Sequence, residues 1–174
     1  MKTRTQNILG VVRIIALIGY IGAAVYGLRI IIPFVGGFLT DKLAFDTGTG
    51  LDSLRETHLL TYISLMSFII ALVILKVRMW ESLRAILEEI DLSSPFSLKI
   101  ASMLENMSYL ILAVGIVYIA GDSYAGYISK KISIVDKGLL KGDFQYLFSA
   151  GVVYVMAQIF RRGVELQDEN ELTV

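Results

Sequence analysis

The side chains that could do chemistry are few in this sequence of 174 residues. There is no cysteine, which excludes a disulfide, a thiolate nucleophile and a thiolate metal site. The single histidine, His58, stands at the start of an apolar segment, where an interfacial residue is expected, and no catalytic motif accompanies it. We therefore expect no enzyme, an intramembrane enzyme included, and no cofactor.

Three aspartates, Asp41, Asp46 and Asp52, lie in the segment 34–57, and aspartates of this kind can bind calcium. Their spacing lacks the alternating ligand pattern of a calcium-binding loop. The same segment contains the glycine pairs "GG" and "TGTG", which favour turns. The sequence predicts a solvated loop with no metal site.

The remaining acidic residues lie at a characteristic distance from the apolar segments. Basic residues lie nearest to the apolar segments, whereas acids lie farther from them. A surface that binds the inner leaflet of a membrane should be basic, because that leaflet is negative. The acids are therefore either a solvated face or a docking surface for a basic protein, to which neighbouring leucines would add apolar contacts. The predicted partner-binding residues are Glu88, Glu89, Asp91, Glu165, Leu166, Asp168, Glu169, Glu171 and Leu172.

Long apolar stretches must position these groups. Apolar residues make up 55% of the chain, and 16 basic residues balance 16 acidic ones, which gives no support for direct nucleic-acid binding. A membrane-spanning helix needs about 20 mainly apolar residues. The chain offers four such segments, at about 8–32, 59–78, 104–121 and 144–161. We predict one all-α domain over 1–174, an integral membrane four-helix bundle with a cytoplasmic tail at 162–174.

The first apolar segment could also be a signal peptide, since basic residues precede it and it contains "GAA". The apolar run continues well beyond those alanines to Ile32, so we expect a retained helix. Within it, Gly19, Ala23 and Gly27 recur every four residues, a stripe that allows another helix to approach closely.

The basic residues also predict orientation. Four spans leave both termini on one side, and more basic residues abut the helix ends on that side than on the other. Arg13 and Arg29 are sixteen positions apart, about 24 Å along a helix, so each can reach its own interface. We predict a multi-pass protein of the bacterial cytoplasmic membrane with both termini cytoplasmic. The predicted interface anchors are Arg13, Arg29, Trp80, Arg161 and Arg162.

The segment between the second and third spans has apolar residues at helical spacing from Met79 to Ile90. The letters "SSPFS" then break the helix, because Ser94 can cap a helix and Pro95 suits its first position. This pattern predicts that helices two and three extend into the cytoplasm as a hairpin that turns between Leu92 and Pro95.

The connection between the third and fourth spans covers residues 121–143. Ile132 and Ile134 alternate with polar residues there, which predicts a short strand lying on the bundle. No catalytic set is recognisable in this connection.

Two stretches carry a family resemblance: "LRAILEEIDLSSPFS", which precedes an apolar helix, and "FRRGVELQDENELTV" at the end. They resemble a widespread family of small bacterial four-helix membrane proteins of unknown function, whose members end in a close variant of FRRGxELQxExxLTV. The resemblance covers most of the chain. The family commonly has Asn-Pro-Phe where this chain has Ser94-Pro95-Phe96, which weakens only the capping argument.

Members of that family are often encoded beside a short helix-turn-helix regulator that resembles a phage Cro repressor. The resemblance therefore implies that the membrane protein governs a cytoplasmic DNA-binding partner, which the acidic surface would hold. The alternative is a small oligomeric channel or transporter subunit, which needs a polar path through the membrane. The middles of the predicted spans offer only Gln158 for such a path. Expected partners are membrane lipid and the regulator, and association with further copies of the chain is left open.

Overall fold

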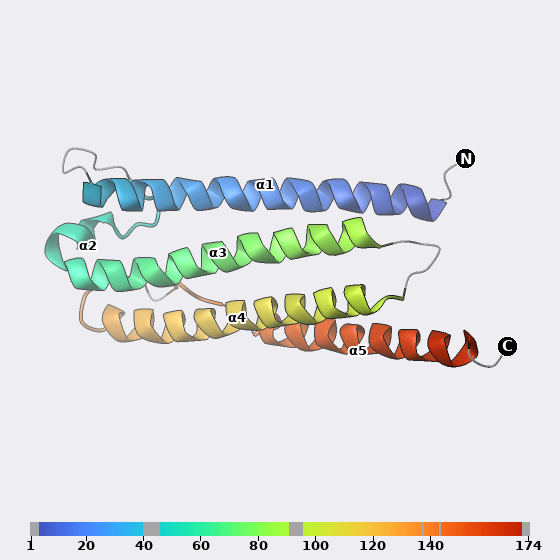
Figure 1. Cartoon of the computed structure of the whole chain (residues 1–174). Coiled ribbons are helices and arrows are strands. Elements are labelled where there is room, and N and C mark those ends of the chain that lie inside the picture. Colours follow the sequence, from blue (N-terminus) through green and yellow to red (C-terminus); the bar gives the residue numbers. More distant parts are fainter. Residues whose placement is uncertain (1–3, 40–45, 91–95, 137, 143, 172–174) are drawn as a thin grey trace.

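The computed structural model describes residues 4–39, 46–90, 96–136, 138–142 and 144–171. These residues form five α-helices and no strand, so the all-α prediction is confirmed (Figure 1). One helix more than predicted is present, a short one that lies inside the segment 34–57, where a loop was expected. The helices are α1 (Arg4–Leu39), α2 (Asp52–Thr57), α3 (Leu59–Glu89), α4 (Leu98–Ser129) and α5 (Gln145–Glu171).

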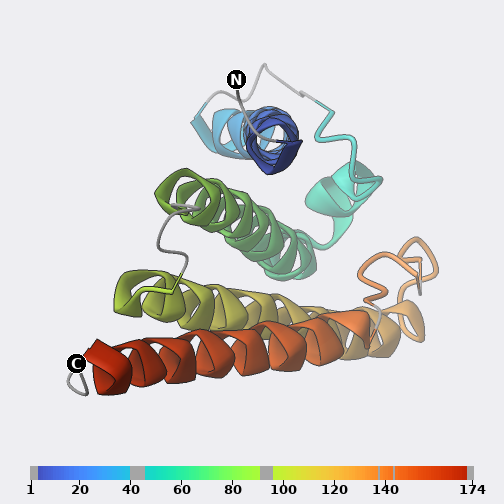
Figure 2. The ribbon, with the colours of Figure 1, turned by 90° about the vertical axis from the view of Figure 1, so that its right-hand side faces the viewer.

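The long helices form a curved row in the order α1, α3, α4, α5 (Figure 2). Consecutive long helices are antiparallel neighbours (Figure 1). Within the described residues, α1 packs along α3 and also contacts α2, whose Arg55 donates to the Gly37 carbonyl. α5 packs along α4 and along no other helix, while α2 packs on α3. The predicted four-helix bundle is therefore not confirmed in this detail, because the two outer helices do not meet among the described residues.

Three helical stretches are long and apolar enough to cross a membrane, namely Thr5–Leu39, Leu59–Glu89 and Leu98–Ser129. Their outward faces carry large exposed apolar side chains such as Ile14, Ile18 and Ile116. The apolar part of α5 is shorter, and Gln158 and two arginines follow soon after its middle, so α5 is not among them. α5 continues into the predicted tail as far as Glu171.

The stripe of small residues in α1 faces α3, as predicted. A Cβ atom on Gly19 would lie 2.5 Å from Cζ3 of Trp80, and one on Gly27 would lie 2.8 Å from Cγ1 of Val73. Both distances are too short for any side chain, so these glycines allow the close approach of the two helices.

The best-packed core lies at the loop end of the molecule, the end that holds α2 and the two longer connections. Leu51 and Leu54 are 1% and 0% exposed there and pack with Leu65 and Met66 of α3. The prediction of a solvated loop over 34–57 is wrong in this respect. Much of that segment is helix, in α1 or α2, and its leucines are buried; Asp41 lies outside the described residues.

The connection after α4 also packs inward instead of forming the predicted strand. Val135 and Leu140 are 3% exposed and belong to the core, whereas Ile134 is exposed. Successive turns shape the chain here, such as the one closed by the bond from the Val135 N–H to the Ile132 carbonyl. The strand prediction is wrong because alternation over so few residues does not specify pairing, and no neighbouring strand is present among the described residues.

The start of α4 differs in one detail from the prediction. Ser97 is the N-cap, since its Oγ accepts a hydrogen bond of 3.1 Å from the Ile100 N–H. Its backbone is extended, and its side chain satisfies a donor that the first helical turn leaves free. Ser97 thus occupies the N-cap position of α4, while Ser94, which was expected to cap a helix, lies outside the described residues. The predicted turn between Leu92 and Pro95 lies outside the described residues.

The helices are offset along the row in a way that the sequence did not reveal. Gly19 faces Trp80, Ser82 and Tyr109 line one groove, and the rings of Tyr109 and Tyr154 are 6.4 Å apart. The middles of the first, third and fourth predicted spans are therefore level with α3 near Trp80. The middle of the predicted span 59–78 lies about 18 Å away, toward the loop end.

Two expectations change because of this offset. The ends of α3 and α4 do not project alone, since α1 begins and α5 ends farther out at the same end of the molecule (Figure 1). We call this end the terminal end. In addition, charged residues do occur level with the apolar middles of the neighbouring helices, contrary to the expectation from the separate spans. They are Lys76, Arg78, Glu81 and Arg84 of α3.

Candidate functional site

The residues that precede α4 are fixed to the last part of α5 at the terminal end. The rings of Phe96 and Phe160 meet edge to face, with centroids 5.4 Å apart at an interplanar angle of 60°. A Cβ atom on Gly163 would lie 2.6 Å from Cδ1 of Phe96. Only glycine leaves room for the ring at this position, so the two stretches that carry the family resemblance touch each other here.

An ion pair beside this contact also joins α5 to α4. Nη2 of Arg161 donates to Oε2 of Glu105 over 2.6 Å, and the Glu105 side chain is only 21% exposed. The hydroxyl of Tyr109 donates to the other oxygen of the same carboxylate over 3.0 Å. Arg161, predicted as an interface anchor, is therefore also a contact between two helices.

A groove of about 460 Å³ opens beside this contact. Its wall is mainly apolar, and Leu166 and Ile159 in it are 46% and 59% exposed. The groove is lined by Phe96, Ile159, Arg162, Gly163, Leu166 and Gln167. Leu166 was predicted to contact a partner from the sequence, whereas the groove itself was not predicted.

The predicted acids at the end of α3 are exposed, but each lies near a base of the same chain. Glu89 is 2.7 Å from Nζ of Lys99, and Glu88 is 3.7 Å from Nη1 of Arg84. These are exposed ion pairs, which are weak because water screens them. They leave both carboxylates accessible to a competing base.

Arg162 forms ion pairs of the same kind with acids of its own helix, α5. Its Nη1 lies 2.7 Å from Glu165 and 3.9 Å from Glu169, and the hydrogen bond that it donates to Glu165 is the main reason that the pKa of the guanidinium is raised. Asp168 is exposed on the same part of the helix. The terminal end therefore presents acidic side chains that are paired with basic side chains of the same chain, and it is not a uniformly acidic surface.

Two of the predicted partner-binding residues, Asp91 and Leu172, lie outside the described residues, and Glu171 ends α5. The acids of α3 and those of α5 share the terminal end, with the α4 start between them (Figure 1). The sequence could not place these two groups relative to each other.

The other predicted anchors contact protein as well. Arg13 donates through Nε to the Leu87 carbonyl over 2.7 Å, and through Nη2 to the Glu88 and Ile90 carbonyls over 3.4 Å each. A guanidinium here satisfies carbonyls that the end of α3 leaves free, and it complements the helix dipole. Trp80 covers Gly19, and Arg29 lies toward Gly48 at the loop end.

The model of the family described as "Protein of unknown function (DUF2975)" matches residues 52–174. The chain belongs to this family. The matched region contains α2 to α5, so both sides of the contact between Phe96 and Gly163 are family sequence. No curated relative and no solved structure matches the chain.

The sequence reasoning missed Phe96, Glu105 and Gly163 as parts of this site. A signal was present for two of them, since Phe96 follows the helix break and Gly163 follows the paired arginines in the quoted stretches. Glu105 gave no comparable signal, because a single glutamate at the start of a helix is usually a solvated residue.

Proposed function

We propose that this DUF2975 protein is a membrane-embedded interaction protein that binds a small cytoplasmic helix-turn-helix regulator at its terminal end. One observation carries the proposal: an apolar groove containing Leu166 lies beside exposed acids of α5 on a helix end fixed by Phe96 and Gly163. A helix-turn-helix protein presents a basic face to DNA phosphates, and such a face complements these acids.

The proposal includes the finer topology. α5 would be the fourth span, and both termini would lie in the cytoplasm of a bacterium. The outward face of α5 supports this, because Phe148, Val155 and Ile159 are 71%, 56% and 59% exposed. A short apolar helix can be accommodated when it lies beside a longer one, since the bilayer thins and flanking arginines reach the interface.

Electrostatics alone would not give useful affinity. Each exposed ion pair contributes about 0.2–1 kcal/mol, and the acids must first exchange their internal bases for those of the partner. The charges would therefore set mainly the association rate and its salt dependence. Apolar contacts in the groove around Leu166 must supply much of the remaining affinity.

The test measures how much regulator the protein captures in isolated membranes at low and at moderate salt. We expect the triple variant Glu165→Gln, Asp168→Asn, Glu169→Gln to capture much less at low salt, and the difference to shrink as salt rises. The matched control carries Glu56→Gln and Asp122→Asn, exposed acids outside the terminal end. Equal capture by the triple variant and the wild type would remove the tail acids from the mechanism.

A channel or transporter subunit is the second candidate, and one observation favours it. Arg78 and Glu81 form an exposed ion pair of 3.1 Å, with grooves of about 370 and 610 Å³ on either side of it. Charged side chains at the level of the apolar helix middles must be shielded from lipid, either by protein or by water in a transport path. Ion flux through protein-containing vesicles tests this candidate, which requires that Glu81→Gln change the flux.

A further inference from the structure

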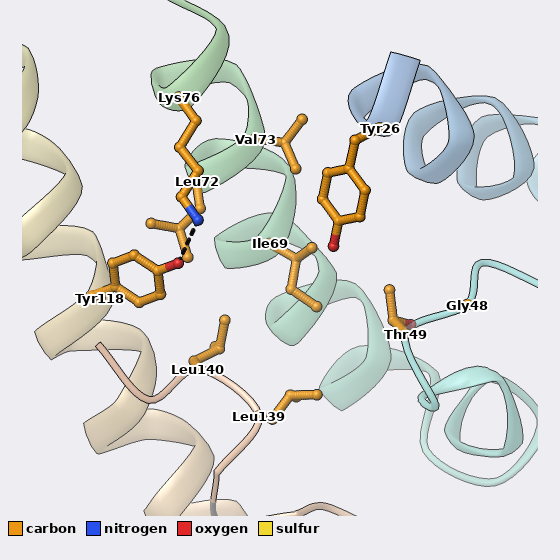
Figure 3. A pocket seen from close by; sticks show the side chains of 10 residues that line it. All are labelled: Tyr26, Gly48, Thr49, Ile69, Leu72, Val73, Lys76, Tyr118, Leu139 and Leu140. Carbon is orange, nitrogen blue, oxygen red and sulfur yellow. Dashed lines mark hydrogen bonds between the residues drawn. The ribbon is translucent and has the colours of Figure 1, made fainter. Parts of the chain in front are cut away.

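A partly enclosed cavity of about 250 Å³ lies between α1, α3, α4 and the two longer connections (Figure 3). Tyr26 of α1 points its hydroxyl toward Ile69, while Lys76 and Tyr118 close the opposite side. Thr49 and Leu140 border it from the connections. One small space thus brings together five separate parts of the chain.

Lys76 is the charged group of this cavity. Its Nζ donates to the Tyr118 hydroxyl over 2.6 Å and lies 5.1 Å from the centroid of the same ring. The side chain is half-buried. Within the described parts of the chain, no carboxylate forms an ion pair with it, since the pairs join other bases to Glu81, Glu88, Glu89, Glu105, Glu165 and Glu169.

This position is unfavourable for a lone ammonium. Leu72 and Val73, both 5% exposed, flank Lys76 on α3, and Leu140 of the cavity wall is 3% exposed. A tyrosine hydroxyl solvates a cation but does not neutralise it, and an unneutralised charge among apolar groups is costly. Among the described residues, Lys76 therefore has a hydrogen-bond acceptor but no counter-charge.

We propose that the cavity binds an anionic amphiphile, whose carboxylate or phosphate oxygens pair with Lys76 and whose apolar part lies along Ile69, Leu72 and Val73. The hydroxyls of Tyr26 and Tyr118 can donate to the same oxygens. The volume accommodates a headgroup with a few carbons, so a longer chain leaves through the open side. A cationic ligand would add repulsion to an already uncompensated ammonium.

The ligand would connect the two sides of the row. Tyr118 stacks on Tyr146 near the start of α5, with centroids 5.3 Å apart at 21°. A group bound at Lys76 would therefore touch α1 and α3 directly and α5 through this stack. This inference does not rest on the proposed docking of a regulator, because it concerns a different end of the molecule.

The experiment uses the full chain in an uncharged detergent and measures its thermal unfolding with increasing decanoate, with decanol as the neutral analogue. We expect decanoate, but not decanol, to raise the Tm saturably. Lys76→Met should weaken the apparent affinity by about tenfold or more, the loss of one charge-assisted hydrogen bond, whereas Lys76→Arg should retain binding. Lys131→Met is the matched control, because Lys131 donates to Tyr127 in a comparable but exposed pair.

Native mass spectrometry separates the two sources of the anion. If the head is a lipid phosphate, phosphatidylglycerol adducts should persist on the wild type, be lost in Lys76→Met, and exceed those of phosphatidylcholine. If the anionic head is a free carboxylate, the stabilisation by decanoate should depend on Lys76, whereas the phosphatidylglycerol adducts should not. Equal decanoate and lipid binding by the wild type and Lys76→Met, or binding of neither probe by the wild type, would overturn the proposal.

Discussion

Gly163 of α5 lies directly against the ring of Phe96, so that α5 and the residues before α4 are sterically coupled at this point. We predict that Gly163→Ala forces the ring away from Phe160 and costs about 1–3 kcal/mol of unfolding free energy, as overpacking does. Denaturant unfolding of the purified protein measures this. Gly151→Ala is the control on the same helix, because no atom lies within 4 Å of a Cβ there. That variant should be neutral or slightly stabilised, since alanine favours helix.

The pair Glu105 and Arg161 allows a second test. We predict that Glu105→Gln destabilises the contact of α4 with α5 by about 1 kcal/mol, because the pair is strong in geometry but its arginine remains partly exposed. A double-mutant cycle with Arg161→Gln isolates the interaction. Additive effects of the two single changes would show that the pair contributes nothing.

Sequence patterns predicted the class of this fold better than its assembly. Apolar segments and the stripe at Gly19 depend on local spacing, which survives in the structure. The shift of two neighbouring helices along their axes depends instead on side chains such as Trp80. Its ring packs over Gly19, which is far away in the sequence. For that reason the offset of α3, and with it the position of Lys76, could not be obtained from the separate spans.

The candidate site was predictable to a similar degree. The acids and Leu166 were identified from their order relative to the apolar segments. The pair of Glu89 with Lys99 was not, because these residues belong to different helices and meet only through the packing of α3 on α4. The burial of Leu51 and Leu54 was missed for another reason, since the glycines before them suggested a solvated turn.

The loop end should respond to acid through Asp46. The pKa of this carboxylate is lowered, first by the hydrogen bond from the Gly48 N–H and then by that from the Asp52 side chain, with a smaller part from Arg29. A lowered pKa in the folded state stabilises the turn above the unfolded value of about 3.9, and this stabilisation is lost as the pH falls through the folded value. The amide resonance of Gly48 should therefore titrate below pH 4. Asp46→Asn should abolish that titration, and a midpoint at or above the ordinary value would contradict the prediction.

The guanidinium of Arg13 should hold the end of α3 in place. We predict that Arg13→Met leaves the carbonyls of Leu87 and its neighbours without their donor, so that the last turn frays. The loss should be about 0.3–1 kcal/mol. Hydrogen exchange at residues 86–90 should then be faster by a few-fold, with exchange at the α3 start unchanged. Uniformly faster exchange along α3 would instead indicate a general loss of packing.

The topology prediction depends on whether α5 crosses the membrane. If all four long helices cross, the two termini lie on one side, whereas three crossings by α1, α3 and α4 alone would place the end of α5 opposite the start of α1. The chain lacks cysteine, so single cysteines report their side without background. We predict that Gln167→Cys in intact cells is protected from a membrane-impermeant maleimide, as is Asn7→Cys, while Glu56→Cys is labelled. The arginines that follow the apolar part of α5 support this result, because basic residues beside a helix end favour the cytoplasmic side. Labelling of Gln167→Cys together with protection of Asn7→Cys would show that α5 does not cross.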